Sequence, residues 1–67
     1  MYHILIQTSR GYRYLGNSID VYNCIDYSKQ MKEEGHPVRV IDNKVLKDWL
    51  KTELISDIPY QIRIKFN

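Results

Sequence analysis

The side chains best suited to covalent or metal chemistry in this 67-residue chain are one cysteine and two histidines. Cys24 falls on the apolar stripe of a predicted helix, where a cysteine is usually a small core residue and not a reactive thiolate. His3 and His36 have no cysteine, histidine or carboxylate at the spacing that metal sites use. We therefore expect no catalytic residue, no metal site and no cofactor.

Paired carboxylates and phosphate-binding loops are also missing from the pattern. Glu33 and Glu34 fall in the last turn of a predicted helix instead of facing each other across a cleft. Each of the three glycines is explained by a turn or a helix end, which leaves none for a loop that cradles phosphate. A chain of 67 residues also has few residues with which to surround an enclosed ligand pocket. We predict that the protein is not an enzyme.

The overall charge excludes two classes of nucleic-acid-related protein. A net charge of +2 is too small for the broad basic field of a non-specific DNA binder, and it has the wrong sign for an acidic DNA mimic. Hydrophobic residues make up 43% of the chain and charged residues 27%, which are proportions of a folded protein and not of a disordered one. We expect a single domain covering residues 1–67.

No pattern in the chain directs it to a membrane or to an oxidising compartment. The first apolar stretch, Ile4–Ile6, is too short for a signal peptide or a membrane span. Cys24 alone cannot form an internal disulfide. We therefore expect a cytoplasmic protein. Ile, Lys, Asn and Tyr, which have AT-rich codons, supply 25 of the 67 residues and point to a low-GC bacterium or its phages, with the host cytoplasm as the location in the second case.

Apolar periodicity predicts the elements of the first two thirds of the chain. Residues 2–9 alternate with the period of a strand, and residues 12–15 can pair back on them as a hairpin. An amphipathic helix is predicted from Val21, with Asp20 as the preferred N-cap and Gly35 as the stop. Residues 38–41 are then predicted to form a third strand.

The remaining residues predict a second helix and a fourth strand. Apolar residues at helical spacing place the helix over residues 44–54, and strict alternation over residues 60–66 predicts the clearest strand of the chain. The fold class is therefore α+β, a small ββαβαβ domain with a four-stranded, mostly antiparallel sheet and two helices packed on one face. The third strand should lie beside the first and antiparallel to it, whereas the position of the last strand stays open.

The sheet face away from the helices is the expected contact surface. A two-residue turn at residues 10 and 11 would place Tyr12 and Tyr14 on this open face and Leu15 in the core, whereas a three-residue turn would bury both tyrosines. We favour the two-residue turn because it sets Leu15 opposite Ile6. The candidate partner-binding residues are Arg10, Tyr12, Arg13, Tyr14, Arg39, Arg63 and Lys65.

Tyrosine and arginine on one surface suit two kinds of partner. Both are enriched at protein interfaces, which favours a small inhibitor or regulator of phage or mobile-element type that covers a site on a larger protein. The alternative is a single-stranded RNA or DNA binder that stacks bases on the tyrosines and meets phosphates with the basic side chains. We expect no membrane partner, and an open sheet edge also allows a homodimer.

Overall fold

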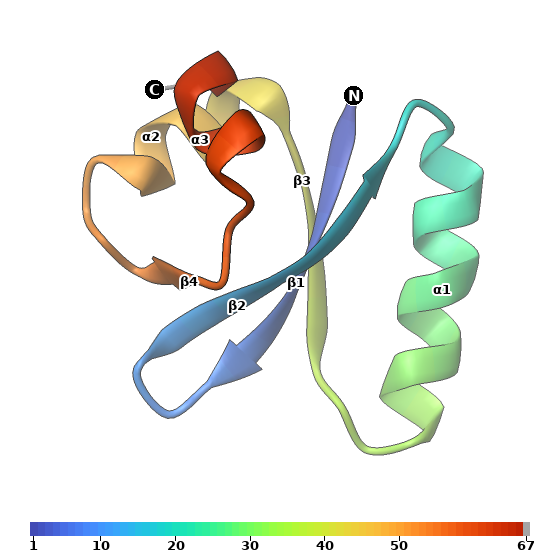
Figure 1. Cartoon of the computed structure of the whole chain (residues 1–67). Coiled ribbons are helices and arrows are strands. Elements are labelled where there is room, and N and C mark those ends of the chain that lie inside the picture. Colours follow the sequence, from blue (N-terminus) through green and yellow to red (C-terminus); the bar gives the residue numbers. More distant parts are fainter. Residues whose placement is uncertain (67) are drawn as a thin grey trace.

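The alternating residues at the N-terminus form a β-hairpin, as predicted. In the computed structural model, which describes residues 1–66, β1 (Tyr2–Thr8) pairs antiparallel with β2 (Gly11–Ser18) (Figure 1). The connection is a two-residue turn, but it consists of Ser9 and Arg10 and so lies one residue earlier than predicted. Its position matters because it decides which residues of the two strands face each other.

The register of the hairpin changes at a bulge in its middle. Leu5 lies opposite Tyr14, and the next pair is Ile4 with Gly16, so Leu15 has no partner on β1. An extra residue of this kind bends the strand and turns its side chain away from the regular alternation. The prediction that Leu15 enters the core is therefore wrong, and its side chain is 37% exposed.

The first helix and the third strand agree with the sequence. The side chain of Asp20 caps α1 (Val21–Glu33) by accepting a hydrogen bond from the backbone N–H of Tyr22 at 2.9 Å. Gly35 follows the helix with φ of +87°, a left-handed conformation that glycine adopts without strain. β3 (Val38–Asp42) then pairs antiparallel with β1, which confirms its predicted neighbour.

The second helix begins where expected and ends early. Asp42 caps α2 (Asn43–Leu50) by accepting from the backbone N–H of Val45 at 2.9 Å. Residues 51–54 leave the helix and return to the hairpin, where β4 (Ile55–Ser56) pairs in parallel with β2. The sheet is therefore mixed, with the order β3-β1-β2-β4.

The predicted fourth strand is wrong, because residues 60–66 form the helix α3 (Tyr60–Phe66). Pro59 precedes it, and the Pro59 carbonyl accepts from the N–H groups of Ile62 and Arg63, both at 3.0 Å. Proline is well suited to the start of a helix. The alternating pattern did not exclude a helix, because Ile62 and Phe66, four residues apart, also share one face of a helix. The element order is therefore ββαβαβα and not ββαβαβ.

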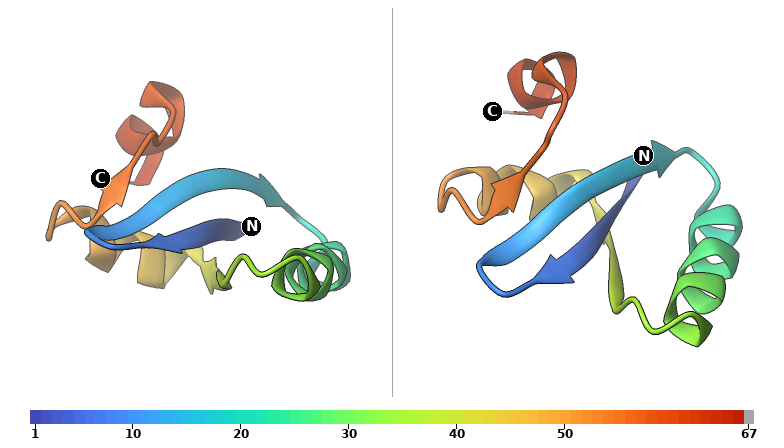
Figure 2. Two further views of the ribbon diagram at one scale, coloured as in Figure 1. Left: turned by 90° about the horizontal axis from the view of Figure 1, so that it is seen from below. Right: turned by 60° about the horizontal axis from the view of Figure 1, so that its bottom comes forward.

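Helices cover both faces of the sheet, which corrects the prediction that two helices share one face and leave the other open (Figure 1, Figure 2). Leu5 packs in the main core cluster with Leu46 of α2, and Phe66 of α3 borders this cluster. Ile4 points to the opposite face and lies outside the cluster, on the side that α1 covers. Within residues 1–66, no helix has the length and apolarity needed to cross a membrane.

Candidate binding site

A histidine in the apolar first strand is the centre of a buried polar network. The His3 ring is fully buried, with Nδ1 2.8 Å from the hydroxyl oxygen of Tyr14 and Nε2 2.8 Å from Oδ1 of Asn43. Asn17 donates from Nδ2 to the same hydroxyl at 2.9 Å, and the Phe66 ring packs edge-on against the imidazole at 5.2 Å between centroids. The network joins β1 and β2 to the first residue of α2 and to α3.

The hydrogen bonds of this network fit a neutral His3. Oδ1 of Asn43 can only accept, so Nε2 carries the proton, and Nδ1 accepts from the Tyr14 hydroxyl. Burial lowers the pKa of His3 below the usual 6.5 and raises the pKa of the Tyr14 phenol. Within residues 1–66 no buried side-chain polar atom lacks a hydrogen-bond partner. We interpret the network as a structural connection between the sheet and the α2–α3 layer.

The cysteine behaves as a core residue. Cys24 is fully buried, and burial raises the pKa of its thiol. We expect its reaction with iodoacetamide in the folded protein to be about 100-fold slower than in denaturant, the slowing given by a local opening of about 3 kcal/mol. Mass spectrometry of quenched samples measures this, and equal rates would show that the thiol is accessible.

In the described part of the chain, no three His, Cys, Asp or Glu side chains lie together as a metal would require.

The two candidate tyrosines lie on the predicted face of the hairpin, but that face is not open. Tyr14 is only 6% exposed and is held in the His3 network. Tyr12 is half-buried and stacks on Trp49 of α2, with 4.7 Å between ring centroids and 27° between planes. Neither ring is free to stack a nucleic-acid base.

The five basic candidates are spread over the molecule. Arg10 is exposed in the hairpin turn, and Arg13 forms an ion pair with Asp57 at 2.8 Å. Arg39 is exposed on β3, with its guanidinium 5.9 Å from the centre of the Trp49 ring. The last two, Arg63 and Lys65, belong to α3. Of the predicted site residues, Tyr12 and Arg39 meet at Trp49, and the role of the whole set in partner binding stays a prediction.

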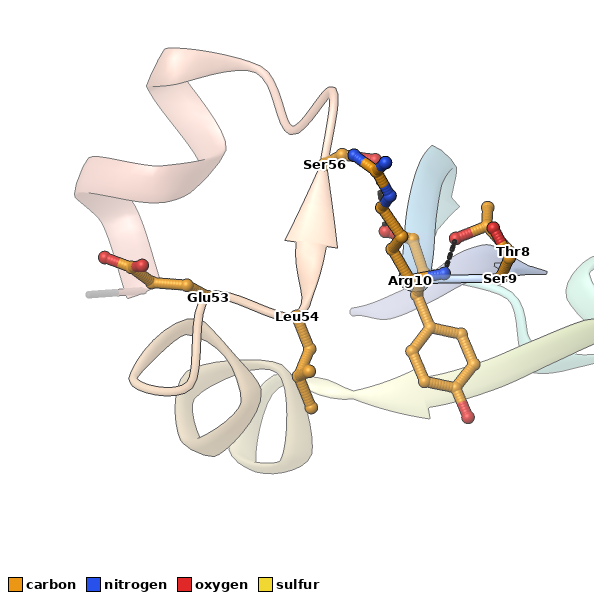
Figure 3. A pocket seen from close by; sticks show the side chains of 7 residues that line it. Thr8, Ser9, Arg10, Glu53, Leu54 and Ser56 are labelled. Carbon is orange, nitrogen blue, oxygen red and sulfur yellow. Dashed lines mark hydrogen bonds between the residues drawn. The ribbon is translucent and has the colours of Figure 1, made fainter.

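A hollow of about 350 Å³ lies beside the hairpin turn (Figure 3). Arg10 extends across it toward Ser56, whereas the side chain of Glu53 points away. Small-molecule sites are lined predominantly by hydrophobic and aromatic side chains, whereas five of the seven residues here are Thr, Ser, Arg or Glu. Its lining residues are Thr8, Ser9, Arg10, Tyr12, Glu53, Leu54 and Ser56.

The outer edge of β3 has backbone groups available for another strand. β3 is the first strand in the sheet order and pairs on one side only, with β1. Gln7 N–H donates to the Pro37 carbonyl at 2.9 Å, which fixes the alternation: Arg39 and Ile41 direct their N–H and C=O groups to β1. Val38 and Val40 therefore direct theirs outward. Within residues 1–66 no other strand covers this edge.

An open groove of about 440 Å³ runs along this edge between α1 and α2. Val21 and Ile25 of α1 form one wall, and Val45 of α2 belongs to the other. Most of the lining surface is apolar, and the apolar side chain of Ile25 is 39% exposed. The full lining consists of Tyr2, Val21, Ile25, Arg39, Val40, Ile41, Asp42 and Val45. We take this groove, the β3 groove, as the candidate binding site.

Comparison with known proteins gives no relative on which to base an assignment. No protein-family model, no curated protein and no solved structure matches the chain. The function is therefore inferred from the geometry of the β3 groove.

Proposed function

We propose that this protein is a non-enzymatic binding module that takes up an extended segment of a partner protein along the outer edge of β3. The observation that carries the proposal is the coincidence of an unpaired strand edge with an apolar groove. Val38 and Val40 offer main-chain hydrogen bonds, and Tyr2, Ile25 and Val45 offer apolar contacts to side chains of the added strand. Recognition by strand addition uses both, the first for affinity and the second for specificity.

Its action on the partner would be steric. A segment held in the β3 groove is withdrawn from its other contacts, so the protein works as an inhibitor or regulator without any chemical step. A phage or mobile-element origin stays a prediction from residue usage. The alternative of single-stranded nucleic-acid binding needs free tyrosine rings on which bases can stack. Tyr14 is buried and Tyr12 is stacked on Trp49, so we do not propose this function.

A proline in the edge of β3 tests this proposal. Panning of a random peptide library on the immobilised protein should enrich peptides with the alternating pattern of a strand. Val40→Pro removes an outward N–H and fills its place with a ring. It should therefore lower the affinity for these peptides by at least about 10-fold, the equivalent of roughly one hydrogen bond. The fold should survive, since proline is tolerated where an edge N–H faces solvent.

Val40→Thr is the matched control, because it keeps the β-branched shape and the backbone N–H. It should bind the selected peptides within about 3-fold of the wild type, a difference below 1 kcal/mol. Circular dichroism and thermal unfolding check that both variants fold. Peptides that bind the folded proline variant as well as the wild type would show that the β3 edge is not the docking site.

A further inference from the structure

We propose that the segment that pairs with β3 is an acidic strand, with apolar residues at every second position and Asp or Glu at those between. This inference rests on the proposed function and names the chemistry of the partner. It follows from Arg39 in the lining of the β3 groove and from the basic residues of α1 beside it.

Beyond the apolar residues that line the groove, α1 has two lysines on the same helix face. Lys29 and Lys32 follow Ile25 by four and seven residues, so they lie on the same face of the helix as this groove residue. Both lysines are exposed. Because α1 runs antiparallel to β3, its apolar first half lies by the C-terminal end of β3 and its basic second half by the N-terminal end (Figure 1).

A third basic residue, Arg39 of β3, lies on the α2 side of the groove. Arg39 points to the α2 face of β3, where it lies over Trp49 and also lines the groove. A residue of an added strand would lie directly beside Arg39 on this face, since side chains of neighbouring strands align across a sheet. The only ion pair among residues 1–66 joins Arg13 and Asp57, far from the groove in the sheet order, so Arg39 has no carboxylate partner in this part of the chain.

The one carboxylate that lines the groove is already engaged. Asp42 accepts the N–H of Val45 as the cap of α2. Arg39 is therefore the one charged residue of the groove lining left to pair with the carboxylates of an added strand, whereas Lys29 and Lys32 lie on the α1 side and contribute only a positive potential along the edge. Complementarity across an interface favours a partner of the opposite sign.

A second copy of the chain fits the groove less well than an acidic segment. Pairing of β3 with β3 of another copy would bring the two Arg39 side chains to the same sheet face, either directly opposite or on the diagonal. Like charges at those positions destabilise a strand pair. An acidic strand places a carboxylate at that position instead.

Three synthetic peptides of one length test the inference. Each is nine residues long, blocked at both ends and labelled with a fluorophore; valine alternates with Glu in the first, with Gln in the second and with Lys in the third. Fluorescence anisotropy should give the Glu peptide at least about 10-fold tighter binding than the Gln peptide, with the Lys peptide weakest. Raising the salt from about 0.05 M to about 0.5 M should reduce this preference, because exposed charges are screened.

Two charge-matched variants locate the effect. Arg39→Gln should reduce the preference for Glu over Gln by several-fold, whereas Lys51→Gln, which removes the same charge beyond the C-terminal end of α2, should leave it unchanged. Equal binding of the three peptides, with sensitivity to Val40→Pro, would overturn the acidic preference and leave strand docking intact. Binding of none of them, together with no peptide from the library, would contradict the proposed function as well.

The two other kinds of partner give distinct outcomes. Concentration-dependent mass in sedimentation that Val40→Pro abolishes would mean that a second copy occupies the groove, and would overturn the inference. A labelled oligothymidine that binds at low salt and competes with the Glu peptide would mean that the basic side chains bind nucleic acid. That result would also overturn the inference.

Discussion

Replacing Gly11 by alanine is expected to lower the free energy of unfolding by about 3 kcal/mol. Gly11 has φ of +141°, and a methyl group on it would overlap the carbonyl oxygen of Leu54. That oxygen accepts the N–H of Tyr12 at 2.8 Å and brings the segment before β4 against the hairpin. The strained backbone and the lost hydrogen bond contribute about 2 and about 1 kcal/mol. Urea unfolding followed by circular dichroism measures the change.

The two other glycines separate the causes of this effect. Gly35 also has positive φ, but no atom lies within 4 Å of the place where its Cβ would be, so Gly35→Ala should cost only about 1 kcal/mol. Gly16 has open space and no positive φ, so Gly16→Ala should be neutral or slightly stabilising. Equal losses for Gly11→Ala and Gly35→Ala would show that the Leu54 carbonyl does not approach the hairpin as closely as described.

The buried His3 should make the protein less stable in mild acid. Its folded-state pKa is lowered by burial, so the neutral ring favours the folded state, and this contribution is fully present above the unfolded pKa of about 6.5. As the pH falls below about 6.5, His3 becomes protonated in the unfolded chain but stays neutral in the folded protein. Stability should then fall by up to about 1.4 kcal/mol for each pH unit, until the folded pKa is reached.

His3→Gln removes this titration and serves as the comparison. At about pH 8 the variant should be less stable than the wild type by about 2 kcal/mol, because hydrogen bonds to Tyr14 and Asn43 are weakened. The difference should shrink toward about pH 5, where the wild type has lost the contribution of the neutral ring. Unfolding free energies that stay parallel over this pH range would show that His3 is not held neutral in the fold.

The hairpin, α1 and β3 could be predicted from the sequence because each is encoded locally. Alternation marks the strands, and Asp20 and Gly35 mark the ends of the helix by their chemistry. The neighbour of β3 followed from the handedness of crossover connections. These features depend on short stretches of the chain and not on distant contacts.

The second half of the chain could not be predicted in the same way. By apolar spacing residues 60–66 fit a strand better than a helix, in which Tyr60 and Ile64 are exposed, and Pro59 was the local sign that favoured the helix. β4 has only two residues, and its pairing depends on the approach of residues 51–54 to Gly11. With a helix in place of the last strand, α2 and α3 cover the sheet face that was expected to be open.

The candidate site was missed for a related reason. The expected surface depended on Tyr12 and Tyr14 being free, but contacts from α2 and the His3 network hold both of them. One sign of the network was present in the sequence: a histidine between apolar strand residues needs buried hydrogen-bond partners. The open edge of β3 depends on the strand order, which is completed by the short pairing of β4 with β2 at the other side of the sheet.

The central claim, that a partner strand pairs with β3, is tested most directly by amide hydrogen exchange at single residues. In the free protein the amides of Val38 and Val40 should exchange faster than those of Arg39 and Ile41, because only the latter pair with β1. On addition of the alternating Val–Glu peptide, the Val38 and Val40 amides should become protected. Unchanged exchange at these two valines while the peptide is bound would contradict the account.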